Sequence, residues 1–194
     1  YNEIRERMKQ KGFRQGFACL FYGGPGTGKT ETVYQLARQT GRDIMTVDVP
    51  QIKSKWVGDS EKNIKALFDR YREISKRCAQ APILLFNEAD AIFGKRMENV
   101  ESSAAQMLNT LQNIILQEME TLDGIMICTT NLHGNLDPAF ERRFIYKIAL
   151  EKPDEKVRGK IWKSMLNGLE ESDYSTLASR FQFSGGQIEN VVRK

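Results

Sequence analysis

The stretch GGPGTGKT at 23–30 has the residue types and spacing that bind a phosphate group. It fits the pattern G-x-x-x-x-G-K-[ST], with Lys29 and Thr30 in the last two places. Glycines let successive backbone N–H groups point into one concavity at a helix start, which attracts an anion. The lysine can reach the β- and γ-phosphates of a nucleotide, and the threonine hydroxyl can bind Mg²⁺. We therefore predict a nucleotide-binding loop made of Gly23, Gly24, Pro25, Gly26, Thr27, Gly28, Lys29, Thr30 and Glu31.

The loop alone leaves the nucleotide and the reaction open. A plain glycine turn is one alternative, but the expected strand before the loop and helix after it argue against that. The chain has no N-K-x-D guanine motif, so ATP is favoured over GTP. A transferase similar to adenylate kinase is compatible with the loop, and the remaining motifs must decide.

A second stretch, ILLFNEAD at 83–90, ends an apolar run with polar groups. An ATPase that ends such a strand with two acids uses the first to hold the water shell of Mg²⁺ and the second to activate water. Glu88 takes the second place, but Asn87 takes the first. An asparagine keeps an acceptor oxygen and loses the charge, so we expect Mg²⁺ binding to weaken by ~1–3 kcal/mol. Asp90 is expected to cap or brace the following turn.

Apolar periodicity predicts the elements that position these residues. Stretches of helical periodicity separate five apolar runs, and strands that alternate with helices predict an open parallel α/β sheet. Three of the runs are nearly continuous, which is typical of parallel strands covered on both faces. The expected strands are 17–22, 44–49, 83–86, 125–129 and 145–150, and apolar stripes mark helices by Val33, Leu36 and Ala37, by Ile64, Leu67, Phe68, Tyr71, Ile74 and Cys78, and by Leu108, Leu111, Ile115 and Met119.

The character of the chain changes after Pro153, where short helices are expected at 154–167, 172–181 and 185–194. We predict a P-loop α/β core over 1–151 and a helical lid over 152–194, with a hinge at 151–154. Because the chain begins with Tyr1 and the lid stops abruptly, we expect a fragment with an incomplete lid.

The bulk composition favours a protein that works in the cytoplasm. The formal charge of +4 is mild and the basic residues are scattered, so a nucleic-acid footprint is disfavoured. Cys19 and Cys128 lie in apolar runs, no C-x-x-C pair occurs, and buried thiols in a reducing compartment are expected. The apolar runs are too short for a membrane span, and no signal sequence opens the chain.

Four motifs together carry a family resemblance: the loop, ILLFNEAD, TTN at 129–131 and ERRF at 141–144. With the run TLDGIMICTTNLHGNLDPAFERRF, the chain resembles the AAA branch of the AAA+ ATPases over nearly its whole length. The resemblance implies a five-stranded α/β core with a helical lid, assembly of identical chains into a hexameric ring, and ATP hydrolysis coupled to remodelling of macromolecules.

The resemblance also implies roles for individual residues. Glu88 would polarise the attacking water, and Asn131 would help to place that water, with a share for Thr129 or Thr130. Thr30, and Asn87 through a water, would hold Mg²⁺, although the family normally has Asp at the position of Asn87. Arg142 and Arg143 would be arginine fingers that act on the site of a neighbouring subunit. Gly185 and Gly186 would pack against adenosine. The alternative for these two glycines is that, with Gln187, they simply begin a helix.

The loop 53–63 resembles the first pore loop of AAA proteins that thread polypeptide, with Trp56, Val57 and Gly58 as the gripping residues. The alternative is a tryptophan packed against its own domain. Three functions follow: a remodelling motor that hydrolyses ATP, a nucleotide-switched scaffold with weak or no hydrolysis, and a nucleic-acid motor. The pore-loop residues 56–58 support the first function, and Glu88, Asn131 and the arginine pair favour retained hydrolysis. Asn87 is the reason to consider the second function. The third is disfavoured because the sequence has no basic stripe with interleaved aromatic residues.

Overall fold

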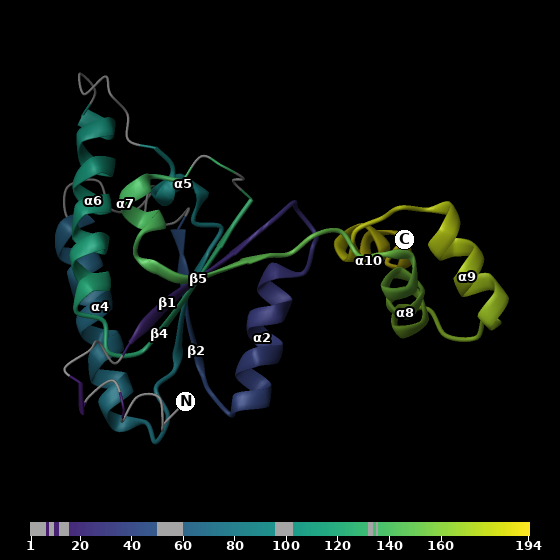
Figure 1. The fold of residues 1–194 in the computed structure, drawn as a ribbon, viewed down its shortest axis with the longest axis horizontal. Helices are drawn as coiled ribbons and strands as arrows, with labels where there is room; N and C mark the ends of the chain where they lie inside the picture. Colours follow the sequence, from purple (N-terminus) through teal and green to yellow (C-terminus); the bar gives the residue numbers. More distant parts are fainter. Residues whose placement is uncertain are drawn as a thin grey trace.

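A computed structural model describes residues 7, 10–11, 16–49, 60–95, 103–131, 134 and 136–194. Its centre is a sheet of five parallel strands in the order β2-β3-β4-β1-β5, flanked by helices (Figure 1). The predicted fold class is therefore confirmed, and each expected strand agrees with an observed one to within a residue. The strands are β1 (Phe17–Tyr22), β2 (Ile44–Asp48), β3 (Ile83–Asn87), β4 (Ile125–Thr130) and β5 (Phe144–Ala149).

Both faces of the central strands are buried, which explains their continuous apolar runs. Alternate residues of a strand point to opposite faces. Ile83 and Leu85 of β3 belong to one apolar cluster with Val33 and Ala37. Leu84 and Phe86 of the same strand belong to a second cluster. Figure 1 shows helix α2 (Lys29–Thr40) on one side of the sheet and helices α4 (Ser60–Arg77) and α6 (Ser103–Glu120) on the other.

Helix α2 begins directly after the glycine loop and ends at Gly41, whose φ of 62° is the left-handed conformation of a helix C-cap. Val33 and Ala37 are buried as predicted. Leu36 is 37% exposed, so its place in the buried stripe was wrong. Residues four apart share a helix face, and Leu36 is turned about 100° from Ala37.

The two long helices on the other side pack as their apolar stripes predict. In α4, Ile64, Phe68 and Tyr71 are buried, and the Tyr71 hydroxyl donates to Pro82 O (2.9 Å) and accepts from Ile125 N (3.0 Å). The stripe extends less far than predicted, because Ile74 is only half-buried and the helix ends at Arg77, before Cys78. In α6 the predicted stripe, Leu108, Leu111, Ile115 and Met119, is buried.

The last strand differs from the others because it lies at the sheet edge. Phe144 of β5 is buried, but the next five residues are exposed. Ile145 and Tyr146 are 56% and 55% exposed. An apolar run therefore marks a strand here without marking a buried one.

The three C-terminal helices form their own apolar cluster, apart from the sheet in Figure 1. They are α8 (Glu155–Met165), α9 (Glu171–Arg180) and α10 (Gly185–Val192). Helices α8 and α10 are slightly shorter than predicted, and α9 begins and ends one residue earlier than predicted. Trp162, Tyr174 and Ile188 meet in the cluster. The Asp154 carboxylate caps α8 by accepting from Val157 N at 2.7 Å, which fixes where the helix begins after Pro153.

Cys19 and Cys128 are buried, as predicted, and burial raises the pKa of Cys19 to about 11. In the described part of the chain, no helix is both long and apolar enough to cross a bilayer.

Candidate nucleotide-binding site

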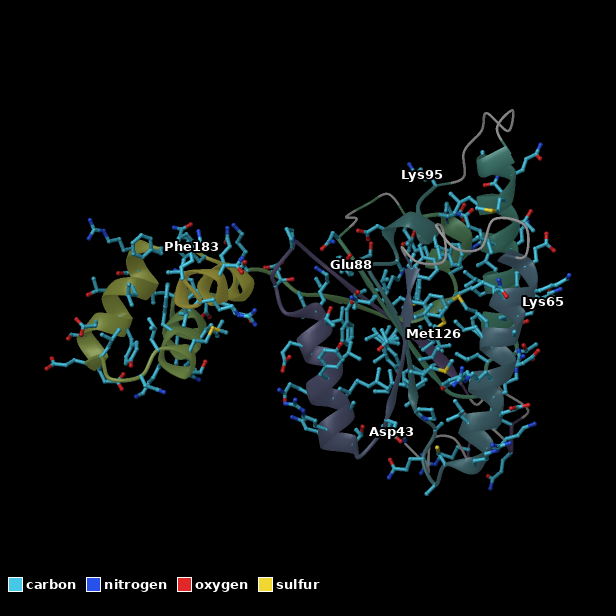
Figure 2. All side chains as sticks on the ribbon, turned by 180° about the vertical axis from the view of Figure 1, so that it is seen from behind. Asp43, Lys65, Glu88, Lys95, Met126 and Phe183 are labelled. Atoms are coloured by element: carbon cyan, nitrogen blue, oxygen red, sulfur yellow. The ribbon has the colours of Figure 1, made fainter. Side chains whose placement is uncertain are left out.

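A cleft of about 760 Å³ lies where the carboxyl ends of the strands face the C-terminal helices. Its lining includes the loop from Pro25 to Glu31, Glu88, the end of β4 and both Gly185 and Gly186. Ligands of open parallel sheets bind outside the carboxyl ends of the strands. Figure 2 shows Glu88 at that end of the sheet and Asp43, which precedes β2, at the other end.

The loop leaves a helix start available to an anion. Gly28 is the N-cap of α2, and as a glycine it has no side chain that could cap the first N–H groups of the helix. The first N–H groups of a helix have no partner within it, so they can donate to a phosphate. The loop's shape requires Gly23, because a Cβ there would lie 2.1 Å from Leu150 O at a φ of +148°. The assignment of this loop to phosphate binding stays a prediction, and its backbone leaves the first N–H groups of α2 available for it.

Lys29 is held across the mouth of this loop. Its Nζ donates to Gly23 O (2.9 Å), Gly24 O (2.8 Å) and Asn131 Oδ1 (2.8 Å). Burial lowers the pKa of Lys29, while the charges of Asp90 and Glu88 oppose that shift. The structure thus brings together the lysine and the Asn131 that the sequence analysis singled out separately.

Asn87 links the loop to the end of the sheet. Its Oδ1 accepts from Thr30 Oγ1 (2.8 Å) and from Thr129 Oγ1 (2.9 Å). Next to it, the exposed Glu88 has a φ of 53°. Thr30 and Glu88 thus line the cleft, and Asn87 is joined to Thr30 by a hydrogen bond without lining the cleft itself.

Asp90 begins the short helix α5 (Asp90–Phe93), whose N-cap is Ala89. The expectation that Asp90 caps or braces the following turn is corrected, because its side chain bonds to the end of β4. Its carboxylate accepts from the Thr130 hydroxyl, from Asn131 N (2.9 Å) and from Asn131 Nδ2 (3.3 Å). Asp90 thus holds the end of β4 and orients Asn131. The sequence could not show this, because the partners are about 40 residues apart in the chain.

The predicted lid glycines touch the loop directly. Gly186 N donates to Gly26 O at 3.0 Å, and a Cβ on Gly26 would lie 2.6 Å from Ser184 Oγ. The Gln187 side chain accepts from Ser184 N (2.9 Å), which completes a capping box at the start of α10. Gln187 therefore serves the helix start, one of the two alternatives for this segment.

The sequence analysis missed an apolar wall of the cleft. Pro153, Val157, Ile161 and Met165 line it, and the last three lie four residues apart on one face of α8. Val157 and Met165 are 42% and 37% exposed. The four-residue spacing of these apolar residues is visible in the sequence. It could not reveal a cleft wall, because an apolar stripe that faces a helix-bundle core has the same spacing.

The two arginines lie outside the lining of this cleft. They follow α7 (Pro138–Glu141), which Asp137 caps by accepting from Ala139 N at 2.7 Å. Arg142 is exposed and its Nε donates to Pro138 O (3.2 Å), whereas Arg143 is half-buried and pairs with Glu120 at the end of α6. The structure does not bring them to Lys29 and Glu88 within one chain.

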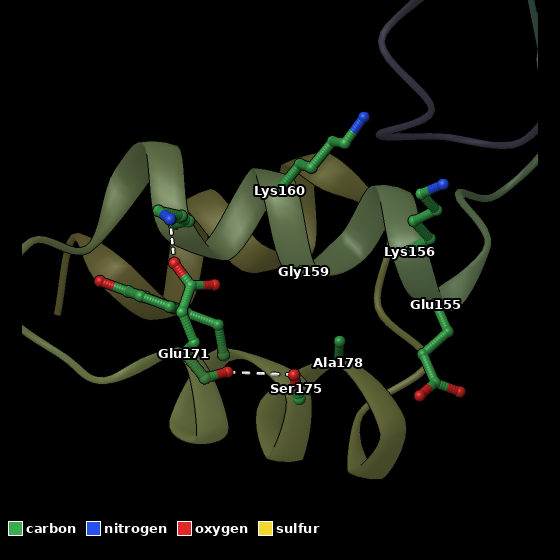
Figure 3. A pocket seen from close by; sticks show the side chains of 9 residues that line it. Glu155, Lys156, Gly159, Lys160, Glu171, Ser175 and Ala178 are labelled. Carbon is green, nitrogen blue, oxygen red and sulfur yellow. Dashed lines mark hydrogen bonds and ion pairs between the residues drawn. The ribbon is translucent and has the colours of Figure 1, made fainter.

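A second groove, of about 480 Å³, lies between α8 and α9. Figure 3 shows Glu171 paired with a lysine of α8, Lys163, while Lys156 and Lys160 point away from Ser175 and Ala178. It lacks the glycine loop and the polar strand ends, so the predicted chemistry belongs to the first cleft. The predicted pore residues Trp56, Val57 and Gly58 lie outside the described residues.

Comparison with known proteins decides the family of this fold and cleft. The sequence model of the ATPase family associated with various cellular activities (AAA) matches residues 19–152, which is more than half of the chain. The chain belongs to the AAA family of ATPases. The matched segment runs from β1 to the residues just before α8, so it contains the glycine loop, the end of β3 and both arginines.

Among its relatives is the cell division cycle protein 48 homolog of Archaeoglobus fulgidus, which is 31% identical over 90% of this chain and 24% of that protein. The protein SUPPRESSOR OF K(+) TRANSPORT GROWTH DEFECT 1 of Arabidopsis thaliana is 32% identical over 91% of this chain and 41% of its own length. Vacuolar protein sorting-associated protein 4 of Dictyostelium discoideum is 31% identical over 90% of this chain and 39% of its own length. The chain spans less than half the length of each of these relatives.

Proposed function

We propose that this chain binds and hydrolyses ATP as part of a ring-forming AAA motor that remodels or unfolds protein. The observation that carries the proposal is the cleft in which Lys29, Thr30, Glu88 and Asn131 converge on one glycine loop. The family membership supports an ATPase. The relative named for vacuolar protein sorting supports a role on other proteins.

Each residue at the cleft has a physical task in this reaction. The N–H groups at the start of α2 and the Lys29 ammonium would bind the phosphate chain. The apolar face of α8, with Val157, Ile161 and Met165, would pack against the base. Glu88 would polarise the attacking water, and Asn131, oriented by Asp90, would help to hold it in line.

The residues present fit a magnesium ion held mainly by phosphate. In the described part of the chain, no group of three or more His, Cys, Asp or Glu side chains could hold a metal. Mg²⁺ commonly takes few protein ligands and keeps several waters and phosphate oxygens. The Thr30 hydroxyl, which donates to Asn87 Oδ1, keeps its lone pairs for the metal. Bound there, the ion would neutralise charge on the phosphates.

Arg142 and Arg143 would act on the cleft of a neighbouring subunit. Their absence from the cleft lining of their own chain fits this geometry. A guanidinium spreads positive charge over the transferring phosphoryl group. Hydrolysis would then require assembly, which makes the ring part of the catalytic unit.

One specific observation favours a second function, a nucleotide-switched scaffold with weak or no hydrolysis. Asn87 lacks the charge that faces the metal in most of the family.

We expect ATP turnover by the intact protein above that of Glu88→Gln, the matched control that removes only the water-activating carboxylate. Replacement of Asn87 by Asp should lower the Mg²⁺ concentration for half-maximal turnover by about 10- to 100-fold.

The same assay separates the two functions. Phosphate release equal to that of Glu88→Gln at saturating Mg²⁺, together with restored turnover in Asn87→Asp, would exclude hydrolysis and leave the switch. Adenine-nucleotide binding, measured in parallel by calorimetry, tests the cleft itself. A protein that binds no nucleotide with magnesium abundant would contradict both functions.

A further inference from the structure

Glu88 has an unusual backbone conformation at the place where chemistry is proposed. Its φ of 53° is the one positive value at a non-glycine position among the described residues. An L-amino acid with a Cβ is disfavoured in this left-handed region, and such residues persist only where their surroundings hold them. The question is therefore which contacts hold Glu88.

The backbone N–H groups of Glu88 and Ala89 are both held by one residue, Thr129 of β4. The hydrogen-bond ladder between β3 and β4 ends at the pair Phe86–Cys128, one residue before Asn87. Beyond that point, Thr129 Oγ1 accepts from Glu88 N at 3.0 Å and Thr129 O accepts from Ala89 N at 2.8 Å. The Thr129 side chain thus continues the pairing where the regular ladder stops.

The same hydroxyl also settles the orientation of the Asn87 amide. A backbone N–H can only donate, so Thr129 Oγ1 must accept from Glu88 N, and its own hydrogen is left for Asn87. The Asn87 atom that receives this hydrogen must then be the oxygen. Thr30 donates to the same oxygen, so the Asn87 NH₂ group lies on the other side of the amide.

We propose that Thr129 is a positioning residue that holds Glu88 in its left-handed conformation and locks the Asn87 amide with its oxygen toward Thr30. An aspartate at 87 would present an acceptor at either end, so its orientation would matter less. With an asparagine, a flipped amide would present NH₂ to the Thr30 hydroxyl in place of the oxygen to which it donates. Thr129 is buried, with 1% of the residue exposed. The proposal rests on the proposed hydrolysis only for its kinetic readout.

The test compares Thr129→Val with Thr129→Ser in the intact protein. Valine keeps the branched shape of the strand residue and removes the hydroxyl, whereas serine keeps the hydroxyl. We expect Thr129→Val to lower kcat by about 10- to 100-fold, the range for a misplaced catalytic group. KM and the dissociation constant for ATP should stay within about threefold, since the loop and Lys29 are untouched. Thr129→Ser should keep kcat within about threefold of the parent.

The matched control is Thr176→Val on α9, where the lost hydroxyl bonds only Ser172 O of its own helix (2.8 Å). A second readout needs no turnover: hydrogen exchange at the Glu88 amide should be faster in Thr129→Val and unchanged in Thr129→Ser and Thr176→Val.

Equal losses of kcat in the valine and serine variants, or an unchanged kcat in Thr129→Val, would overturn the positioning role. If the parent protein shows no turnover, the proposed hydrolysis fails by itself. The exchange at the Glu88 amide then decides the positioning role, and equal exchange in parent and Thr129→Val would overturn it.

Discussion

At the scale of single residues, the site depends on Glu88 being held in a conformation that its backbone disfavours. A left-handed residue with a Cβ is less stable than glycine there by ~1–2 kcal/mol. A conformation kept at such a cost in stability is typical of sites where the strain aims a side chain. The carboxylate of Glu88 needs this turn to face the cleft.

Glu88→Gly should therefore be more stable than Glu88→Ala, the reverse of the usual order of these residues. We expect a difference of ~1 kcal/mol in the free energy of unfolding, measured by denaturant titration. Both variants lack the carboxylate, so both should lose turnover. The difference in their free energies of unfolding therefore reports the strain of the backbone at position 88. An alanine variant as stable as the glycine variant would show that the strain is absent.

At the scale of elements, the loop and α10 meet backbone to backbone. Gly186 N donates to Gly26 O, and a Cβ on Gly186 would lie 3.0 Å from Gly26 Cα. The neighbouring Gly185 has more room, since its Cβ would lie 3.6 Å from Gly26 O. A side chain at position 186 would therefore press against the phosphate loop, whereas one at position 185 would make an ordinary contact.

Gly186→Ala and Gly185→Ala form a matched pair at this contact. Alanine favours a helix over glycine by ~0.5–1 kcal/mol, so Gly185→Ala should be neutral or stabilising. Gly186→Ala should weaken ATP binding by about tenfold, because the added carbon separates the loop from α10 and opens one wall of the cleft. Calorimetry on the two variants checks this, and equal affinities would contradict a role for the contact.

At the scale of the whole molecule, the two arginines proposed to take part in hydrolysis lie outside the cleft lining of their own chain. Arg142 is exposed at the C-terminal end of α7, and Arg143 pairs with Glu120. A ring in which each subunit completes its neighbour's site would bring them together. Such head-to-tail contacts close into rings when the rotation between subunits allows it.

Mixing two inactive variants tests this arrangement. Arg142→Ala and Glu88→Gln should each lose turnover in pure rings. In an equal mixture, about a quarter of the interfaces would pair an intact Glu88 with an intact neighbouring Arg142, so activity should reappear at about that level. Lys163→Ala, which removes an exposed cation of α8, should stay active alone. A mixture as inactive as its parts would contradict action between subunits.

The sequence by itself determined the sheet, its helices and the phosphate loop. Apolar periodicity and glycine requirements are local properties, so β1, the glycine loop and α2 could be predicted in their order, as could the burial of Val33 and Ala37. The exposure of Leu36 and of most of β5 escaped prediction, because apolar character does not reveal which face of an element a neighbour covers.

Only the tertiary structure decided how the polar residues at the strand ends are connected. Thr129 holds Glu88 and Asn87 because the strand order places β4 beside β3, although 41 residues separate Glu88 from Thr129. The same order lets Asp90 orient Asn131, and the packing of α8 over the loop turns Val157, Ile161 and Met165 into a wall of the cleft. Hydrogen bonds between distant segments depend on which strands become neighbours, and the pattern within any one segment carries no record of that.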